Sequence, residues 1–168
     1  MERQKTTLVV DASIVVKWFV PEQNSDLALK LRDAHVDGSV GLIAPDLVAY
    51  EVANALRYRA DLSEKDYEKC IRSLFDFNII MLAPSSRSII DGSKLAKRSD
   101  LTIYDAAYYE IARNLDCSLI TADEQFFKKV AMPKKEKDAD TRVVLLKDYF
   151  ESDDRINFSH QKTGPDAD

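Results

Sequence analysis

The stretch LVVDASIVVKW, residues 8–18, decides the fold. Three apolar residues lead up to Asp11 and a second apolar run begins after Ser13, which predicts a buried strand that feeds a short helix. Asp11 would then lie at the carboxyl end of a strand, the edge at which open parallel α/β sheets bind their ligands. The alternative interpretation is an Asp that only caps the following helix.

Strand and helix patterns alternate along the rest of the chain, which is typical of a parallel sheet with helices on both faces. We therefore predict an α/β fold, a single α/β/α sandwich with a five-stranded parallel sheet. The strands are expected at residues 8–10, 40–44, 78–82, 118–121 and 142–146. The helices are expected around 27–34, from Pro45, from Ser63, from Pro84, over 101–114 and over 123–130.

The length of 168 residues predicts one domain with a sizeable core, which we place at residues 1–150. Residues 132–140 are predicted to form a solvated loop, and the polar residues 151–168 a disordered tail. No apolar run approaches the roughly 20 residues that cross a bilayer, and the start does not resemble a signal peptide. We therefore expect a cytoplasmic protein that does not contact membranes.

Several kinds of chemistry lack their residues in this sequence. Four glycines form neither a G-x-G-x-x-G motif nor a P-loop, and His35 and His160 lie far apart without a nucleophile elbow. Cys70 and Cys117 lack metal-ligand spacing and are expected to be free thiols. Catalysis, if present, must come from carboxylates.

The net charge of −5 argues against a nucleic-acid partner, but its distribution softens that argument. Residues 151–168 hold five acids and two bases, so the tail carries −3 and the body −2. Basic side chains at Lys94, Lys97 and Arg98, and between Lys128 and Lys137, could line a phosphate track, although a solvated face is the commoner reason for such runs.

Glu51 is the second acid of interest. Its neighbours three and four positions away in PDLVAYEVANAL are apolar or neutral, so it lies on a face that packs inward. A buried acid is costly unless it is paired or bound to metal. A salt bridge to Arg57 or Arg59 is the alternative interpretation, but neither lies at a helical spacing that would make it local.

Asp105 and Asp123 complete the set. Asp105 follows Thr102 by three residues, which is nearly a capping box, and Asp123 follows the fourth predicted strand, where it could also cap a helix. Jointly the pattern is more demanding, because Asp11 and Asp123 would share one sheet edge.

Four such acids would repel one another by about 4 kcal/mol per close pair at an effective dielectric constant near 20. A cation would relieve this repulsion, and ligands that are all oxygen favour Mg²⁺ or Mn²⁺ over zinc. Without metal, at least one carboxyl group should have a raised pKa, and added metal should raise the melting temperature.

The four motifs VVDAS, PDLVAYEVANAL, LTIYDAAYYEIA and LITADEQF, in this order, resemble the PIN-domain family, and most closely the VapC-type ribonuclease toxins. The resemblance covers residues 7–150. It implies that the catalytic and metal-binding residues are Asp11, Glu51, Asp105 and Asp123, supported by the hydroxyl groups of Ser13 and Thr121.

The resemblance also implies the reaction and the partners. Mg²⁺ or Mn²⁺ would be held by Asp11 and Asp105, with Glu51 and Asp123 directly or through water, for hydrolysis of single-stranded RNA. A small VapB-type antitoxin would bind through an amphipathic segment, and the protein would form a homodimer.

Three alternatives stay open at this point. One is a PIN-domain factor of RNA processing or decay that is not a toxin. The second is a non-catalytic, receiver-like signalling module, which usually has two adjacent acids after its first strand, whereas VVDAS has one. The third is a phosphatase. A dehalogenase-type phosphatase needs D-x-D, and Ser13 stands where its second acid would be.

Overall fold

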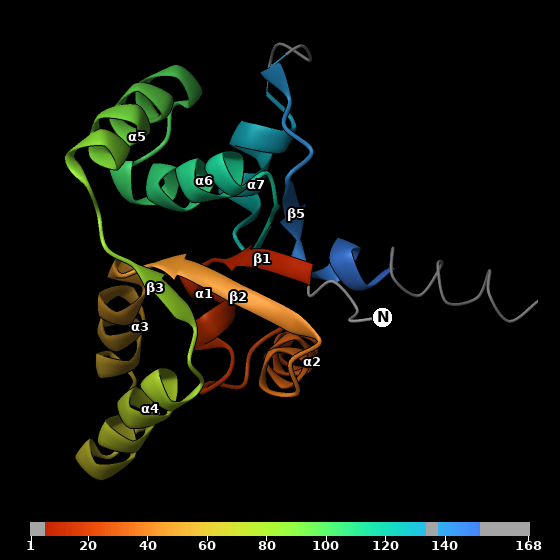
Figure 1. Ribbon diagram of the computed structural model, residues 1–168. Helices are drawn as coiled ribbons and strands as arrows, with labels where there is room; N and C mark the ends of the chain where they lie inside the picture. The colour runs from red at the N-terminus through yellow and green to blue at the C-terminus, as the bar shows by residue number, and fades with distance from the viewer. Residues whose placement is uncertain (1–5, 134–137, 152–168) are drawn as a thin grey trace, which may run out of the picture.

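The computed structural model describes residues 6–133 and 138–151 and confirms the α/β sandwich (Figure 1). Five parallel strands form one sheet in the order β3-β2-β1-β4-β5. The strands are β1 (Thr6–Val10), β2 (Val40–Pro45), β3 (Ile80–Leu82), β4 (Ser118–Thr121) and β5 (Val143–Leu145). The helices are α1 (Ala12–Val16), α2 (Ser25–Val36), α3 (Leu47–Arg57), α4 (Glu64–Asp76), α5 (Ser86–Ser99), α6 (Ile103–Leu115) and α7 (Glu124–Ala131).

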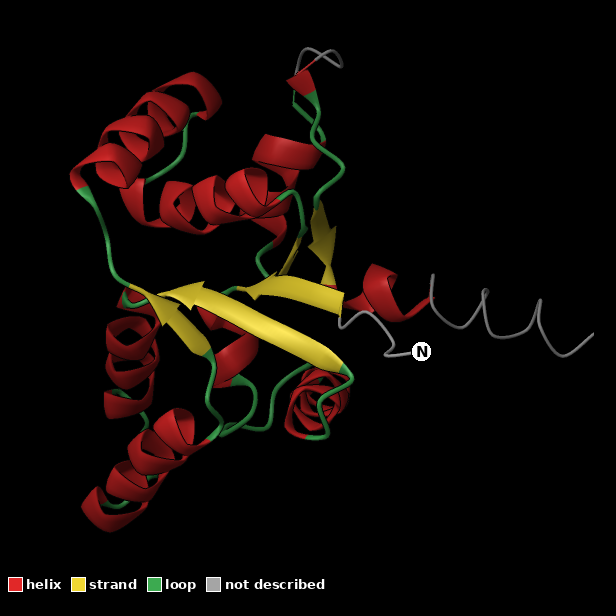
Figure 2. Cartoon of the chain, in the orientation of Figure 1, coloured by secondary structure: helices red, strands yellow, loops and turns green. Residues whose placement is uncertain are grey.

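The helices form two layers, one on each face of the sheet (Figure 2). Helices α1 to α4 accompany the connections from β1 to β2 and from β2 to β3, and they lie together on one face. The chain then returns across the sheet, so α5, α6 and α7 lie on the other face. The direction of winding therefore changes between β1 and β4, which are neighbours. Ligands of open α/β sheets bind at such a switch point.

The central strands are buried on both faces, which explains why their sequences are continuous apolar runs. Val9 and Val10 in β1 and Leu119 and Ile120 in β4 are completely buried, because helices cover both faces of these strands. Trp18 is also buried and packs edge-to-face against Phe77, with ring centroids 5.4 Å apart. Within residues 6–133 and 138–151, every helix is too short or too polar to span a bilayer.

Two helix starts differ from their prediction. Pro45 is the last residue of β2 and is followed by Asp46, so it does not stand in the first turn of α3. Pro84 precedes α5, whose N-cap is Ser85 in a reciprocal capping box with Ser88. In both places the proline lies before the helix, and at α5 the capping box decides where the helix begins.

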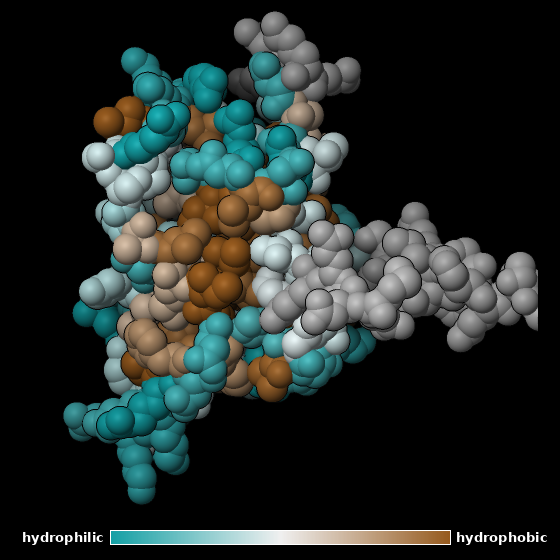
Figure 3. Space-filling view, viewed as in Figure 1, coloured by the Kyte–Doolittle hydropathy of each residue, from teal (hydrophilic) through white to brown (hydrophobic). Residues whose placement is uncertain are grey.

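Several apolar side chains remain on the surface. Phe75 belongs to the apolar pattern of α4 but is 55 % exposed, and Ile89 and Ile90 of α5 are exposed as well. Ile80 and Leu82 point outward from the edge strand β3. Figure 3 shows apolar residues gathered in a band across this side of the molecule, at the level of the sheet.

His35 joins three segments on the face that carries α2. Its Nδ1 accepts a hydrogen bond from the Leu42 amide, at 3.2 Å, and its Nε2 lies 2.9 Å from the Phe77 carbonyl oxygen. Because Nδ1 acts as the acceptor, the proton of a neutral ring lies on Nε2, which donates to Phe77. His35 therefore has a structural role and ties α2 to β2 and to the end of α4.

We expect His35→Ala to lower the free energy of unfolding by about 1–3 kcal/mol, because both backbone groups lose their partner. Urea unfolding followed by Trp18 fluorescence measures this. The exposed neighbour Val36 supplies the control, since Val36→Ala should change stability by no more than about 0.5 kcal/mol. Equal stabilities of the two variants would contradict the role assigned to His35.

Candidate metal and catalytic site

Asp11 lies where the winding of the sheet changes. Its amide donates to the Ile120 carbonyl oxygen at 3.0 Å and so continues the pairing of β1 with β4 past the end of the strand. Its carboxylate makes no capping bond to α1. Instead, Oδ2 accepts hydrogen bonds from the hydroxyl groups of Ser13, at 2.7 Å, and Thr121, at 2.6 Å. The capping interpretation of Asp11 is therefore wrong.

The same two hydroxyl groups also hold the chain that follows β4. Ser13 Oγ accepts from the Ala122 amide at 3.0 Å, and Thr121 Oγ1 accepts from the Asp123 amide at 3.0 Å. Each hydroxyl group thus donates to Asp11 and accepts from the backbone beyond β4. The structure places both predicted supporting residues beside Asp11, and they fix one of its carboxylate oxygens.

Glu51 is half-buried on α3 and accepts a hydrogen bond at Oε2 from the hydroxyl group of Tyr108, which lies on α6. The predicted alternative, a salt bridge to Arg57 or Arg59, is wrong. Arg59 makes a two-pronged contact with Asp61, and the Arg57 guanidinium group stacks 4.5 Å above the Tyr58 ring centre. Glu51 therefore has a neutral partner, Tyr108, and no cationic partner among the described residues.

Asp105 stands in the first turn of α6, as expected, but only its backbone takes part in the cap. The Thr102 hydroxyl oxygen accepts from the Asp105 amide at 3.0 Å. Among the described residues, the Asp105 carboxylate has no hydrogen-bond or ion-pair partner, so capping does not explain the acid. A neutral side chain at this position would satisfy the helix equally well.

Asp123 does cap a helix. Its Oδ1 accepts from the amides of Gln125, at 2.8 Å, and Phe126, at 3.0 Å, at the start of α7. The capping interpretation is therefore confirmed for this acid. Its second oxygen, Oδ2, has no partner in the described part of the protein, so the cap leaves half of the carboxylate available.

The four acids lie close enough to influence one another's charge. Burial raises the pKa of Asp11 most strongly, the two hydroxyl groups lower it, and the charges on Asp105 and Asp123 raise it. Burial likewise raises the pKa of Glu51 to about 7; the Tyr108 hydrogen bond opposes this, and Asp11 and Asp105 add to it. The sequence predicted a raised pKa from repulsion between the acids, but burial is the larger cause.

Within residues 6–133 and 138–151, no three His, Cys, Asp or Glu side chains already stand in the arrangement of a metal cage. Mg²⁺ does not require one, because it commonly keeps several waters and binds one or two carboxylates directly. The donor set suits that mode. Asp11, Glu51 and Asp123 each have one oxygen fixed by a hydrogen bond and one without a partner in this part of the chain.

Tyr108 is the site residue that sequence reasoning missed. Tyrosines at helical spacing usually fill the core, and Tyr108 and Tyr109 are buried, whereas Tyr104 is exposed. Burial raises the pKa of Tyr108 above its usual range, so its hydroxyl group stays protonated and donates to Glu51. The only available signal was its position three residues after Asp105, on the same side of the helix.

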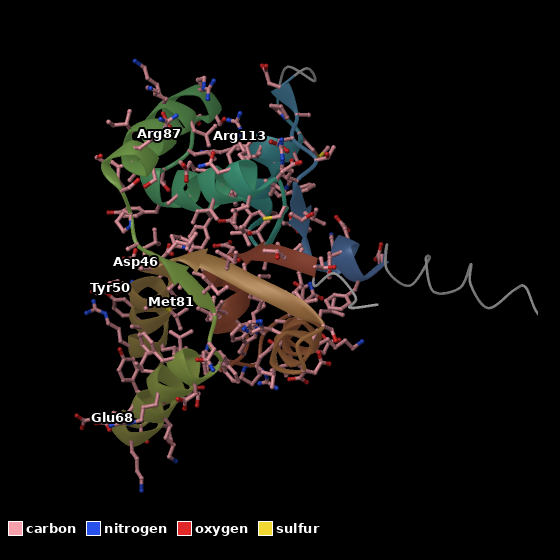
Figure 4. The ribbon with its side chains drawn as sticks, in the orientation of Figure 1. Asp46, Tyr50, Glu68, Met81, Arg87 and Arg113 are labelled. Carbon is pink, nitrogen blue, oxygen red and sulfur yellow. The ribbon has the colours of Figure 1, made fainter. Side chains whose placement is uncertain are left out.

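Three of the basic residues proposed for a phosphate track already have acidic partners. Lys94 pairs with Asp91, Lys128 pairs with Glu124, and Lys129 contacts Asp100. Arg87 and Arg113 lie on the layer formed by α5 and α6 (Figure 4). The residues 134–137 of the lysine-rich loop fall outside the described residues, and the track stays a prediction.

Comparisons with known proteins bear on the family and the fold. The profile of the PIN-domain family matches residues 8–132. The chain is 34 % identical over 126 residues to Ribonuclease VapC3 of Pyrobaculum aerophilum, which covers 73 % of this chain and 93 % of that protein. The crystal structure of PAE2754 from the same organism superposes with a TM-score of 0.58 at 19 % identity, covering 94 % of this chain and 100 % of that one.

The raised pKa of Glu51 predicts a pH dependence of stability in the absence of metal. Between its ordinary pKa of about 4.5 and about 7, the native state keeps the Glu51 proton and the unfolded state loses it. Native stability should therefore fall as pH rises through this window, by up to about 3 kcal/mol from this group. Unfolding in urea with EDTA, at pH values on both sides of the window, measures the fall.

Glu51→Gln should make the fall smaller, because the amide does not titrate. Glu68, an exposed acid at the far end of α4 (Figure 4), supplies the matched control, and Glu68→Gln should keep the full pH dependence. A pH dependence of Glu51→Gln identical to that of the unaltered protein would show that Glu51 does not hold a proton in the folded state.

Proposed function

The chain belongs to the PIN-domain family, and on that premise we propose that it is a metal-dependent endoribonuclease that hydrolyses phosphodiester bonds of single-stranded RNA. The observation that carries the proposal is the arrangement around Asp11. Asp105 and Asp123 lie close enough to Asp11 to raise its pKa, and Asp11 in turn raises the pKa of Glu51. Two hydroxyl groups hold Asp11 and leave its Oδ1 without a partner among the described residues.

We assign Asp11 and Asp105 as the residues that would bind Mg²⁺ or Mn²⁺ directly, with Glu51 and Asp123 binding it directly or through water. When bound, the ion would activate a water molecule and neutralise charge on the scissile phosphate. Ser13 and Thr121 hold Asp11 by its Oδ2, which would leave Oδ1 to bind the ion. Products with a 5′-phosphate and a 3′-hydroxyl group follow from in-line attack by water.

Glu51 is suited to accept the proton of the attacking water at Oε1. Its Oε1 has no partner in the described part of the protein, so this oxygen is free to accept a proton from water. Tyr108 holds the other oxygen and fixes the direction of Oε1. The proton acceptor would thus be supplied by α3 and oriented by α6, from the opposite face of the sheet.

We further propose that the protein is the toxin of a toxin–antitoxin pair in the cytoplasm, bound by a small VapB-type antitoxin and active as a homodimer. The similarity to Ribonuclease VapC3 supports the toxin assignment. Growth arrest on expression, relieved by a small protein encoded beside the gene, would separate this role from one in RNA processing or decay.

Cleavage of a labelled single-stranded RNA tests the enzyme assignment. We expect the purified protein to cleave it with Mg²⁺ or Mn²⁺, and EDTA to abolish cleavage. Asp105→Asn should reduce the rate at least about 100-fold, because the amide loses the charge that binds the ion. Since the carboxylate takes no part in the helix cap, this variant should keep its fold.

The outcomes of this experiment differ in meaning. Equal cleavage by Asp105→Asn would indicate a contaminating nuclease or another site. Absence of cleavage by the unaltered protein on many RNA sequences, in the presence of both ions, would remove the enzyme assignment.

Metal binding has a readout that does not depend on activity. At a free ion concentration of 100 times the Kd, binding stabilises the native state by about 2.7 kcal/mol, which raises the melting temperature by about 5–10 °C in a chain of this size. Asp11→Asn should lose this rise. Asp76→Asn should retain it, because Asp76 is exposed at the opposite edge of the sheet, before β3 begins. A rise of equal size in both variants would place the ion elsewhere.

A further inference from the structure

A second feature of the molecule lies directly beside the acids. It is a half-open hollow of about 110 Å³ at the ends of β4 and β5, closed on its other side by the segment that joins α1 to α2. Lys17, Gln23 and Asn24 line it from that segment, and Lys147 lines it from the residues after β5. None of these four residues belongs to the site described above.

The hollow and the acidic site share a wall. Thr121 and Ala122 line the hollow. The hydroxyl group of Thr121 donates to Asp11, and the amide of Ala122 donates to Ser13. Thr121 and Ala122 therefore stand between the hollow and the residues that hold the Asp11 carboxylate.

Lys17 brings an ammonium group with spare hydrogen-bonding capacity. Its side chain is only 11 % exposed, and its Nζ donates to Glu22 at 3.1 Å. An ammonium group has three N–H donors, and in the described part of the protein the other two have no acceptor. A largely buried cation with two free donors fits an oxygen-rich anion.

The other polar groups of the hollow are also mainly donors. Lys147 is exposed and has no ion-pair partner among the described residues. The side-chain amides of Gln23 and Asn24 are likewise without a partner there, and Asn24 does not use its side chain to cap α2. Glu124 is the one acid that lines the hollow, and its carboxylate pairs with Lys128 at 3.3 Å. The hollow therefore favours an anion over a cation.

Resting on the proposed function, we propose that this hollow is a subsite for the RNA phosphate next to the scissile one, bound by Lys17 and Lys147. The acids repel RNA, and an ion held by them serves the scissile phosphate. A neighbouring phosphate needs a cation of its own. Lys17, after α1, and Lys147, after β5, would provide it from two sides of the hollow. The subsite would set the register of the strand on the enzyme.

The test separates binding from cleavage. In the Asp105→Asn background, the affinity for a fluorescein-labelled single-stranded RNA is measured by anisotropy over a range of KCl concentrations with Mg²⁺ present. One phosphate contact on a single strand contributes about 0.7 to the slope of log Kd against log salt. Lys147→Gln should lower the slope by about that amount and weaken binding about fivefold near 0.1 M salt.

Lys17→Gln should do the same, and the double variant should lose about twice the slope. With Asp105 intact, both single variants should raise KM and leave kcat close to that of the unaltered enzyme. Lys65→Gln is the matched control, because Lys65 is an exposed lysine of α4 without an ion pair among the described residues. Lys17→Gln removes the contact with Glu22 and could disturb the fold. Lys147 is exposed, so Lys147→Gln should keep the fold and tests the subsite independently.

Each outcome decides between the two proposals. Cleavage by the unaltered protein, with Lys147→Gln matching Lys65→Gln in slope and KM, overturns the subsite and leaves the ribonuclease assignment intact. Failure of the unaltered protein to cleave RNA overturns the proposed function and, with it, this subsite. A reduced slope for Lys147→Gln and Lys17→Gln but not for Lys65→Gln supports the subsite.

Discussion

The hydrogen bonds that Ser13 and Thr121 donate to one oxygen of Asp11 hold this structure's site together. The bond from Thr121 joins residues 110 positions apart in the chain, and the same two hydroxyl groups accept hydrogen bonds from the backbone amides of the segment after β4. Because β1 and β4 belong to the two halves of the sheet that wind in opposite directions, these bonds close the seam between the halves. The other acids are placed relative to this fixed oxygen.

The arrangement costs stability in the free protein. Asp11 and Glu51 are acids in surroundings that disfavour their charge, and neither has a cation as partner among the described residues. A protein selected for stability alone would pair or replace such groups. The surrounding core, with completely buried central strands, tolerates this local cost.

The alternation of strand and helix patterns predicted the strands, their parallel direction and the sheet edge that carries Asp11 and Asp123. It did not predict the order of the strands in the sheet. The sequence alone could not show which of the two acids beside a helix start uses its carboxylate to cap the helix. Asp123 caps a helix and Asp105 does not, although both stand beside a Thr that invites the same interpretation. Whether a carboxylate or only its backbone amide serves the cap depends on rotamers set by tertiary packing.

Contacts between distant helices were equally hidden. The bond from Tyr108 to Glu51 joins α6 to α3 across the end of the sheet, and no short-range pattern couples residues 57 positions apart. Likewise, the apolar spacing of α4 and α5 predicted helices correctly but not the exposure of Phe75, Ile89 and Ile90. Periodicity shows which residues share a face, and only the packed structure shows whether that face is covered.

The two edges of the sheet have a consequence for self-association. Both edge strands, β3 and β5, are three residues long, and the chain turns away from each into a helix or a loop. A strand from another chain would find only a few free backbone groups there, so the sheet offers a poor template for extension or for cross-β aggregation. Stable association between copies would therefore depend on contacts between helices and side chains, and not on added strands.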